Sequence, residues 1–190
     1  NKNISAKRNV RSWALKLLDE KEAVAQTFGI ILLARTWKRG DAEEIEDFLA
    51  SSDPFQRRAA FCALGTNNKK AFQPHIDTVA EDPSEFVRMV VPHVYGGSRS
   101  WIKRDWLHYL DKDHTVADYN YHSRYSGRFR SLPDKPRSAL MKLTADLSPK
   151  VRIESYLSLL SNRVSIDLSY LVDTSRPLPD REAGSRRISA

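Results

Sequence analysis

The stretch SSDPFQRRAAFCALG, residues 51–65, decides the expected fold. Asp53 can accept hydrogen bonds from the free N–H groups at a helix start, and Pro54 fits the first helical turn. Gln56 would complete a capping box, and mainly small and apolar residues follow it. Gly65 would then end the helix in a left-handed conformation. The stretch therefore predicts a short helix with one apolar stripe.

The same helix-start and helix-end residues recur along the chain at intervals near thirty residues. Gly65, Gly96 and Gly127 are each separated by 31 residues. Asp-Pro pairs begin at Asp53 and again at Asp82, 29 residues later. A fixed period of this length is typical of a solenoid, in which each helical pair buries its apolar stripe against neighbouring pairs.

We therefore expect an all-α fold, an α-solenoid of about five antiparallel helical pairs stacked in sequence order. The expected pairs are 4–18 with 20–38, 42–50 with 54–64, 70–80 with 84–95, 99–110 with 114–125, and 136–146 with 150–161. Residues 1–175 would form one domain and residues 176–190 a flexible C-terminal tail.

Pro92 and several apolar residues carry more specific expectations. Pro92 removes the hydrogen bond to Arg88 and should kink its helix. Trp13 falls on the same stripe as Leu17, so we expect it to pack in the core. The other residues expected to be buried are Phe55, Ala59, Leu64, Ile76, Val87, Val91, Leu140, Ile153 and Leu157.

Three segments resemble the second helix of a HEAT repeat: residues 51–65, EDPSEFVRMVVPHVYGG at 81–97, and LSPKVRIESYLSLL at 147–160. They share Asp-Pro or Ser-Pro, then an arginine beside an apolar residue or a second arginine, then small and aliphatic residues. The resemblance covers about residues 19–163 and implies stacked helical pairs. It says little about function, because HEAT-like folds serve scaffolds, carriers and a few enzymes.

Arginines occupy similar places in these three segments, at Arg57 or Arg58, at Arg88 and at Arg152. The HEAT resemblance implies that each pairs with the Asp of a neighbouring repeat, which is a structural role. The alternative is a basic stripe that faces a ligand, to which Lys150 would also contribute. The two interpretations differ in exposure, so the sequence leaves both open.

Charge is unevenly distributed. Lys and Arg total 31 against 24 Asp and Glu, a net charge of +7. Residues 1–16 carry five basic side chains and no acid, whereas residues 41–53 carry six acids and no base. Basic faces attract phosphate or acidic partners, although a solvated helix face can also be basic without binding anything.

Residues 113–130, DHTVADYNYHSRYSGRFR, interleave aromatic and basic side chains. Such a mixture is typical of protein-interface hot spots and of nucleic-acid stacking sites. The alternative is a degenerate repeat packed with tyrosines, and the sequence does not decide between helix and loop. The candidate binding residues here are Tyr121, Arg124, Tyr125 and Arg128.

No catalytic residue, metal site or cofactor is predicted. The chain has no phosphate-cradling Gly-rich motif, no G-x-S-x-G and no H-E-x-x-H. Its single cysteine, Cys62, lies among apolar residues and excludes a disulfide scaffold, so no disulfide-linked partner is expected. No apolar run is long enough to span a membrane. We therefore expect a cytoplasmic protein, either processed, since it begins with Asn1, or a domain of a longer chain.

These patterns predict a non-catalytic binding module that presents a concave, partly basic surface to a protein partner or to other domains of a longer chain. The expected contact residues are Arg57, Arg88, Tyr121, Arg124, Tyr125, Arg128, Lys150 and Arg152. The alternative is a nucleic-acid-binding protein, because DFLASSDPFQRRAAFCALG also resembles the repeats of HEAT-like alkylpurine DNA glycosylases. Their Asn-Trp-Asp region is absent, and only Asp105-Trp106 stands in its place.

Overall fold

The structure, a computed structural model, describes residues 2–96 and 132–165, with side chains from residue 9 onward. These residues form helices and contain no strand, so the expected all-α class is confirmed. The expected helices at 99–110 and 114–125 and the tail at 176–190 lie outside the described residues.

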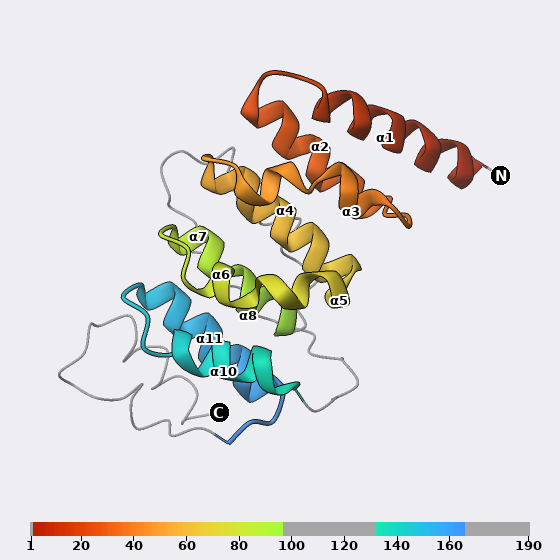
Figure 1. The fold of residues 1–190 in the computed structure, drawn as a ribbon. Coiled ribbons are helices and arrows are strands. Elements are labelled where there is room, and N and C mark those ends of the chain that lie inside the picture. Colours follow the sequence, from red (N-terminus) through yellow and green to blue (C-terminus); the bar gives the residue numbers. More distant parts are fainter. Residues whose placement is uncertain (1, 97–131, 166–190) are drawn as a thin grey trace.

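The helices occur as pairs in two layers (Figure 1). One layer holds the first helix of each pair: α1 (Lys2–Leu18), α3 (Asp41–Glu44) with the 3-10 turn η1 (Asp47–Ala50), α5 (Lys69–Phe72) with η2 (Gln73–His75) and α6 (Ile76–Ala80), and α10 (Asp134–Leu143). The other holds the second helices: α2 (Ala23–Arg35), α4 (Pro54–Asn67), α7 (Glu85–Arg88) with α8 (Val90–Tyr95), and α11 (Pro149–Ser161).

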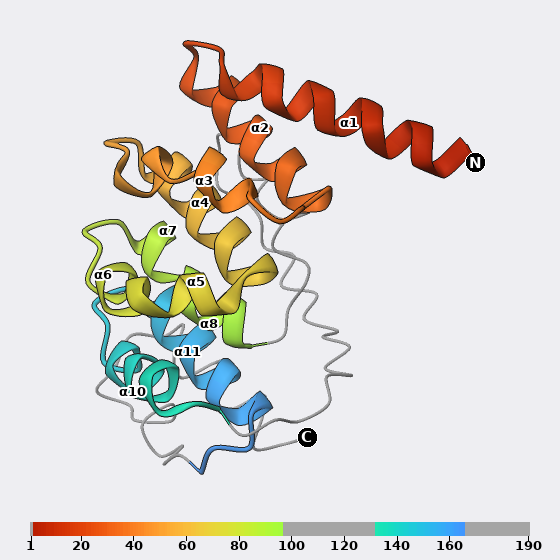
Figure 2. The same cartoon turned by 45° about the vertical axis from the view of Figure 1, so that its right-hand side comes forward.

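The second helices pack side by side, with α2 on α4, α4 on α7 and α8, and α8 on α11 (Figure 2). The sequence predicted that another pair would separate α8 from the pair α10 and α11. That order is wrong, because α11 contacts α8 directly and α10 contacts α6. The Asn162 side-chain amide donates to the Tyr95 carbonyl oxygen at 2.8 Å, so the C-terminal ends of α8 and α11 are in direct contact.

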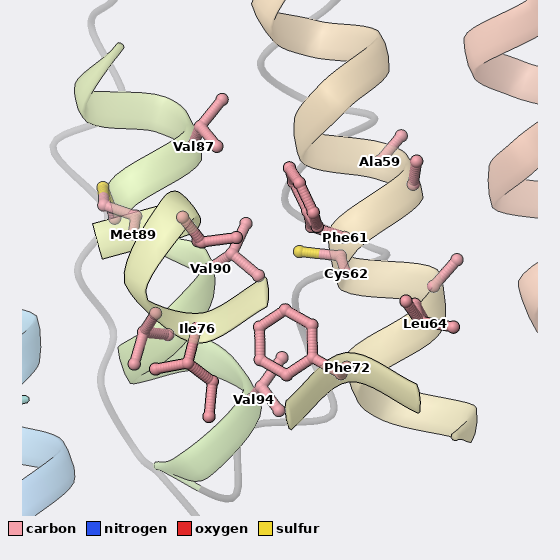
Figure 3. Close-up of a cluster of buried hydrophobic side chains, with 14 of the residues drawn as sticks. Ala59, Phe61, Cys62, Leu64, Phe72, Ile76, Val87, Met89, Val90 and Val94 are labelled. Atoms are coloured by element: carbon pink, nitrogen blue, oxygen red, sulfur yellow. The ribbon is translucent and has the colours of Figure 1, made fainter. Parts of the chain in front are cut away.

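The core lies between the layers and follows the stack (Figure 3). Phe61 of α4 meets Phe72 edge to face, with ring centroids 6.4 Å apart, and Cys62 is buried beside it. Seven of the nine residues expected in the core are buried, while Phe55 and Ile153 are partly exposed. Trp13 is 64% exposed, so its expected core position is wrong; the stripe that α1 buries on α2 passes through Ala14 instead.

Two glycines differ from the left-handed helix ends that the sequence predicted. Gly65 does not end its helix but lies inside α4, which continues to Asn67. Gly96 does end α8, but in a right-handed conformation with φ −75°. A Cβ on Gly65 would lie 2.5 Å from Val94 Cγ2, so this glycine allows α4 and α8 to approach closely. The left-handed glycine in the described residues is Gly40, with φ 98°, at the start of α3.

The helix starts also differ in detail from the expected capping boxes. Asp53 does accept a hydrogen bond from the Phe55 N–H at 2.8 Å. Gln56, however, donates to Gln26 Oε1 of α2 rather than back to Asp53. Side-chain amides therefore link neighbouring second helices here instead of closing a box.

Pro92 acts as expected. The second helix of its pair is divided into α7 and α8, and the break lies at Met89, one residue after Arg88. Since Pro92 has no N–H to donate to the Arg88 carbonyl, the division follows from the missing hydrogen bond.

Candidate functional site

The three arginines of the second helices make the same local contacts. Arg57 Nη1 donates to the carbonyl oxygens of Ser51 and Ser52, at 2.7 and 3.1 Å. Arg88 Nη1 does the same to Asp82 and Pro83, at 2.8 and 3.0 Å. In each case the acceptors lie six and five residues earlier, so the guanidinium closes the loop that precedes its helix.

Arg152 repeats this contact. Its Nη1 donates to the carbonyl oxygens of Asp146 and Leu147 at 2.6 and 3.0 Å, again six and five residues earlier. Three loops therefore have one geometry because each has an arginine at the same distance along the chain.

Two of these arginines also form ion pairs with the next pair of helices. Arg57 binds Asp82 through Nε and Nη2, at 2.9 and 2.8 Å. Arg88 binds Asp146 in the same bidentate way, at 2.7 and 2.9 Å. The exposed fractions of the four side chains are 7–15%, so each pair is largely withdrawn from water.

The carboxylates in these pairs have a second role. Asp82 Oδ1 also accepts from the Ser84 N–H, and Asp146 Oδ1 from the Ser148 N–H, both at 2.8 Å. Each aspartate thus orders the turn before its own helix while it binds the arginine of the preceding pair. Hydrogen bonding to its aspartate is the main cause that raises the pKa of Arg57 and of Arg88.

A second set of contacts joins neighbouring second helices at their C-terminal ends. The Asn67 side-chain amide donates to the Ala34 carbonyl oxygen of α2 at 3.2 Å. Asn162 makes the equivalent contact with Tyr95 of α8 at 2.8 Å. Asn67 and Asn162 also donate to the carbonyl oxygen four residues earlier in the chain, at 2.9 and 2.8 Å.

The structure describes only some of the candidate binding residues. Arg57, Arg88 and Arg152 lie in one row along the second helices, and the first two are held in ion pairs. Lys150 lies two residues before Arg152 in the first turn of α11; it is half exposed, and its Nζ lies 3.9 Å from Glu85 Oε1. Tyr121, Arg124, Tyr125 and Arg128 lie outside the described residues.

Sequence reasoning missed two polar contacts. Arg11 of α1 binds Asp41 in a bidentate pair at 2.5 and 2.6 Å, and Asp41 also accepts from the Lys38 N–H. His93 of α8 and Glu154 of α11 meet in the interior, with Nε2 and Oε2 4.0 Å apart and each side chain at most 4% exposed. Neither contact has a signal in the sequence, because the partners are distant along the chain. The six-residue spacing from Asp82 to Arg88, repeated from Asp146 to Arg152, is a signal that could have indicated the arginine row.

The described parts of the chain contain no group of three His, Cys, Asp or Glu side chains placed to hold a metal ion. Among the described helices, none is long and apolar enough to span a bilayer. No family model matches the chain, and no curated protein is significantly similar to it.

Proposed function

We propose that this protein is a HEAT-like α-solenoid that acts as a non-catalytic binding module for a protein partner. The observation that carries the proposal is the repeated arginine contact at Arg57, Arg88 and Arg152, with the same two carbonyl acceptors in each loop. Repetition of one packed unit is the means by which solenoids build an extended surface.

The contacts of these arginines also support a rigid scaffold rather than a set of independent helices. Arg57 and Arg88 join each second helix to the aspartate of the next pair, and Asn67 and Asn162 join the opposite helix ends. Contacts at both ends of neighbouring helices resist sliding and splaying. A surface held in this way can bind a partner with little loss of conformational entropy.

We place the partner on the second-helix surface around Lys150 and the candidate residues Tyr121, Arg124, Tyr125 and Arg128. Arginine and tyrosine are the side chains most often responsible for binding energy at interfaces. Because Arg57 and Arg88 are already paired with aspartates, their contribution would be to hold the surface in shape.

The test is site-specific photo-crosslinking from the two layers of the full chain. A photoreactive residue replaces Lys150 on the second-helix layer or, as a matched control, the exposed Arg137 on α10 of the other layer. Position 150 should capture one partner band that position 137 does not, and Tyr121→Ala with Arg124→Ala should remove it without lowering Tm. Equal capture from both positions, or loss of the band only through unfolding, would contradict the proposal.

The alternative function, nucleic-acid binding by a protein related to the glycosylases, needs cations that are not already paired. Arg57 and Arg88 do not meet that requirement on the second-helix surface. Cations that do meet it lie at another part of the fold.

A further inference from the structure

Five basic side chains gather where the second helices end. The C-terminal ends of α2 and α4 are adjacent, because Asn67 donates to the Ala34 carbonyl oxygen. The turn after α2 and the start of α5 therefore lie on the same edge of the stack, on the right-hand side of Figure 1. We call the exposed basic residues of these two segments the cation row: Arg35, Lys38, Arg39, Lys69 and Lys70.

The cation row has no acidic partner within the described parts of the chain. Some exposed cations elsewhere in those parts do pair with acids, since Lys142 binds Glu81 at 2.6 Å and Arg137 binds Asp134 at 2.7 Å, although Lys16 and Lys21 form no such pair there either. None of the five forms such a pair, and the nearby Asp41 is already bound to Arg11. Among the described residues, no ion pair neutralises the positive charge at this edge.

Helix electrostatics do not account for the cation row. A cation is favourable in the last turn of a helix, which explains Arg35 at the end of α2. Lys38 and Arg39 lie beyond that helix, and Lys69 and Lys70 belong to α5, which has only four residues and therefore too small a dipole to favour or disfavour a charge. Burial lowers the pKa of Lys69, whose Nζ lies 5.0 Å from the centre of the Tyr95 ring. Apart from Arg35 at the end of α2 and Lys69 beside the Tyr95 ring, neither helix ends nor aromatic rings in the described residues account for these charges.

We propose that the cation row is a binding site for the phosphodiester backbone of a nucleic acid. Protein interfaces are depleted in lysine and centre on apolar side chains. The large apolar side chains exposed in the described residues are Trp13, Val24, Met141 and Leu147, and none of them lies in the two segments of the row. Backbone phosphates, in contrast, are bound mainly by lysine and arginine, without an apolar centre.

The proposal goes beyond the scaffold function and does not depend on it. The cation row lies at the loop edge of the stack, whereas the proposed protein surface lies along the second helices. The five cations come from loops and helix ends rather than from a helix that could enter a groove of the nucleic acid. They would therefore contact its phosphates and not distinguish its base sequence.

The experiment measures binding of the full chain to a labelled DNA duplex of about 20 base pairs over a range of salt concentrations. If the five cations each neutralise one phosphate, the slope of log K against log salt should be about −4.5. Affinity would then fall about 500-fold between 50 and 200 mM salt.

The decisive variant is Arg35→Gln with Arg39→Gln and Lys70→Gln. Its matched control is Lys16→Gln with Lys21→Gln and Lys142→Gln. Each triple variant lowers the net charge from +7 to +4, since 7 − 3 = 4. The slope should shrink to about −1.8 in the first variant and stay near −4.5 in the control. Arg35→Lys with Arg39→Lys, which keeps both charges, should bind as the wild-type protein does.

Three outcomes would overturn the proposal. One is the absence of duplex binding at 50 mM salt by a protein whose circular dichroism is helical. Another is an equal loss of slope in the two triple variants, which would mean that only net charge matters. The third is tight binding of a polyglutamate peptide with no binding of DNA, which would assign the cation row to an acidic protein.

Discussion

Asp82→Ala is the substitution that tests most directly whether the arginine row holds the stack together. It removes both hydrogen bonds from Arg57, at 2.9 and 2.8 Å, and the acceptor for the Ser84 N–H. Breaking a fully buried pair costs about 3–5 kcal/mol. Here Arg57 is 14% exposed and keeps its two carbonyl acceptors, so the ion-pair loss should be nearer 2 kcal/mol.

The lost turn acceptor adds about 1 kcal/mol, for a total of about 3 kcal/mol. For a chain of this size, such a loss corresponds to a decrease of about 6–12 °C in Tm. Urea unfolding followed by far-UV circular dichroism measures the free energy, and Asp134→Ala is the matched control. Asp134 pairs with Arg137 but is 95% exposed, so its loss should change stability by less than about 0.5 kcal/mol.

A double-mutant cycle between Arg57→Ala and Asp82→Ala separates the pair from the turn. The coupling free energy should be about 1–3 kcal/mol, because the two side chains contact each other directly. A coupling near zero, or an Asp82→Ala variant as stable as Asp134→Ala, would refute the reasoning. The aspartate would then be a surface residue that merely lies beside an arginine.

Further substitutions test the packing and the charge of the same helices. Gly65→Ala should destabilise by about 1–3 kcal/mol in urea unfolding, because the new Cβ meets Val94 Cγ2 at 2.5 Å; adding Val94→Ala should restore part of the loss. Leu64→Ala should destabilise by about 2–4 kcal/mol through lost burial, and an effect below 0.5 kcal/mol would contradict its buried position. Asn162→Ala should remove about 1 kcal/mol with the contacts it makes across α8 and α11, and hydrogen exchange should increase at the C-terminal end of α11. Burial lowers the pKa of Lys69 below its ordinary value of 10.5. Stability should therefore rise as pH increases from that lowered pKa toward 10.5, and Lys69→Gln should abolish this part of the rise.

Much of the local structure could be predicted from the sequence. Asp53 and Pro54 indicated where α4 begins, and Pro92 indicated where its helix divides into α7 and α8. These signals act within a few residues, since they depend on which backbone N–H groups are present and which side chain can reach them. The similar placement of Arg57, Arg88 and Arg152 could also be predicted, because each lies a few residues after the start of its segment.

The sequence indicated the arginines of the candidate site but not the aspartates with which they pair. The spacing near thirty residues predicted that α11 would follow a further pair, whereas it packs directly on α8. A period gives the length of a unit but not the neighbour against which that unit packs. Gly65 shows the same limit: a glycine can allow a left-handed turn or a close contact between helices, and only its neighbour Val94 decides which.

The sequence by itself determined the helical class, the helix starts and the repeated arginines, because these follow from hydrogen bonding and periodicity along one segment of chain. Only the tertiary structure decided that Arg57 meets Asp82 and that Arg88 meets Asp146. It also decided that the cations after α2 and α4 lie on one edge, where they form no ion pair with a described acid. Whether a charge is paired can depend on a residue far away along the chain, and for Arg88 and Asp146 that separation is 58 positions. The Coulomb energy of such a pair depends on the distance between the two charges in space, and helix packing sets that distance.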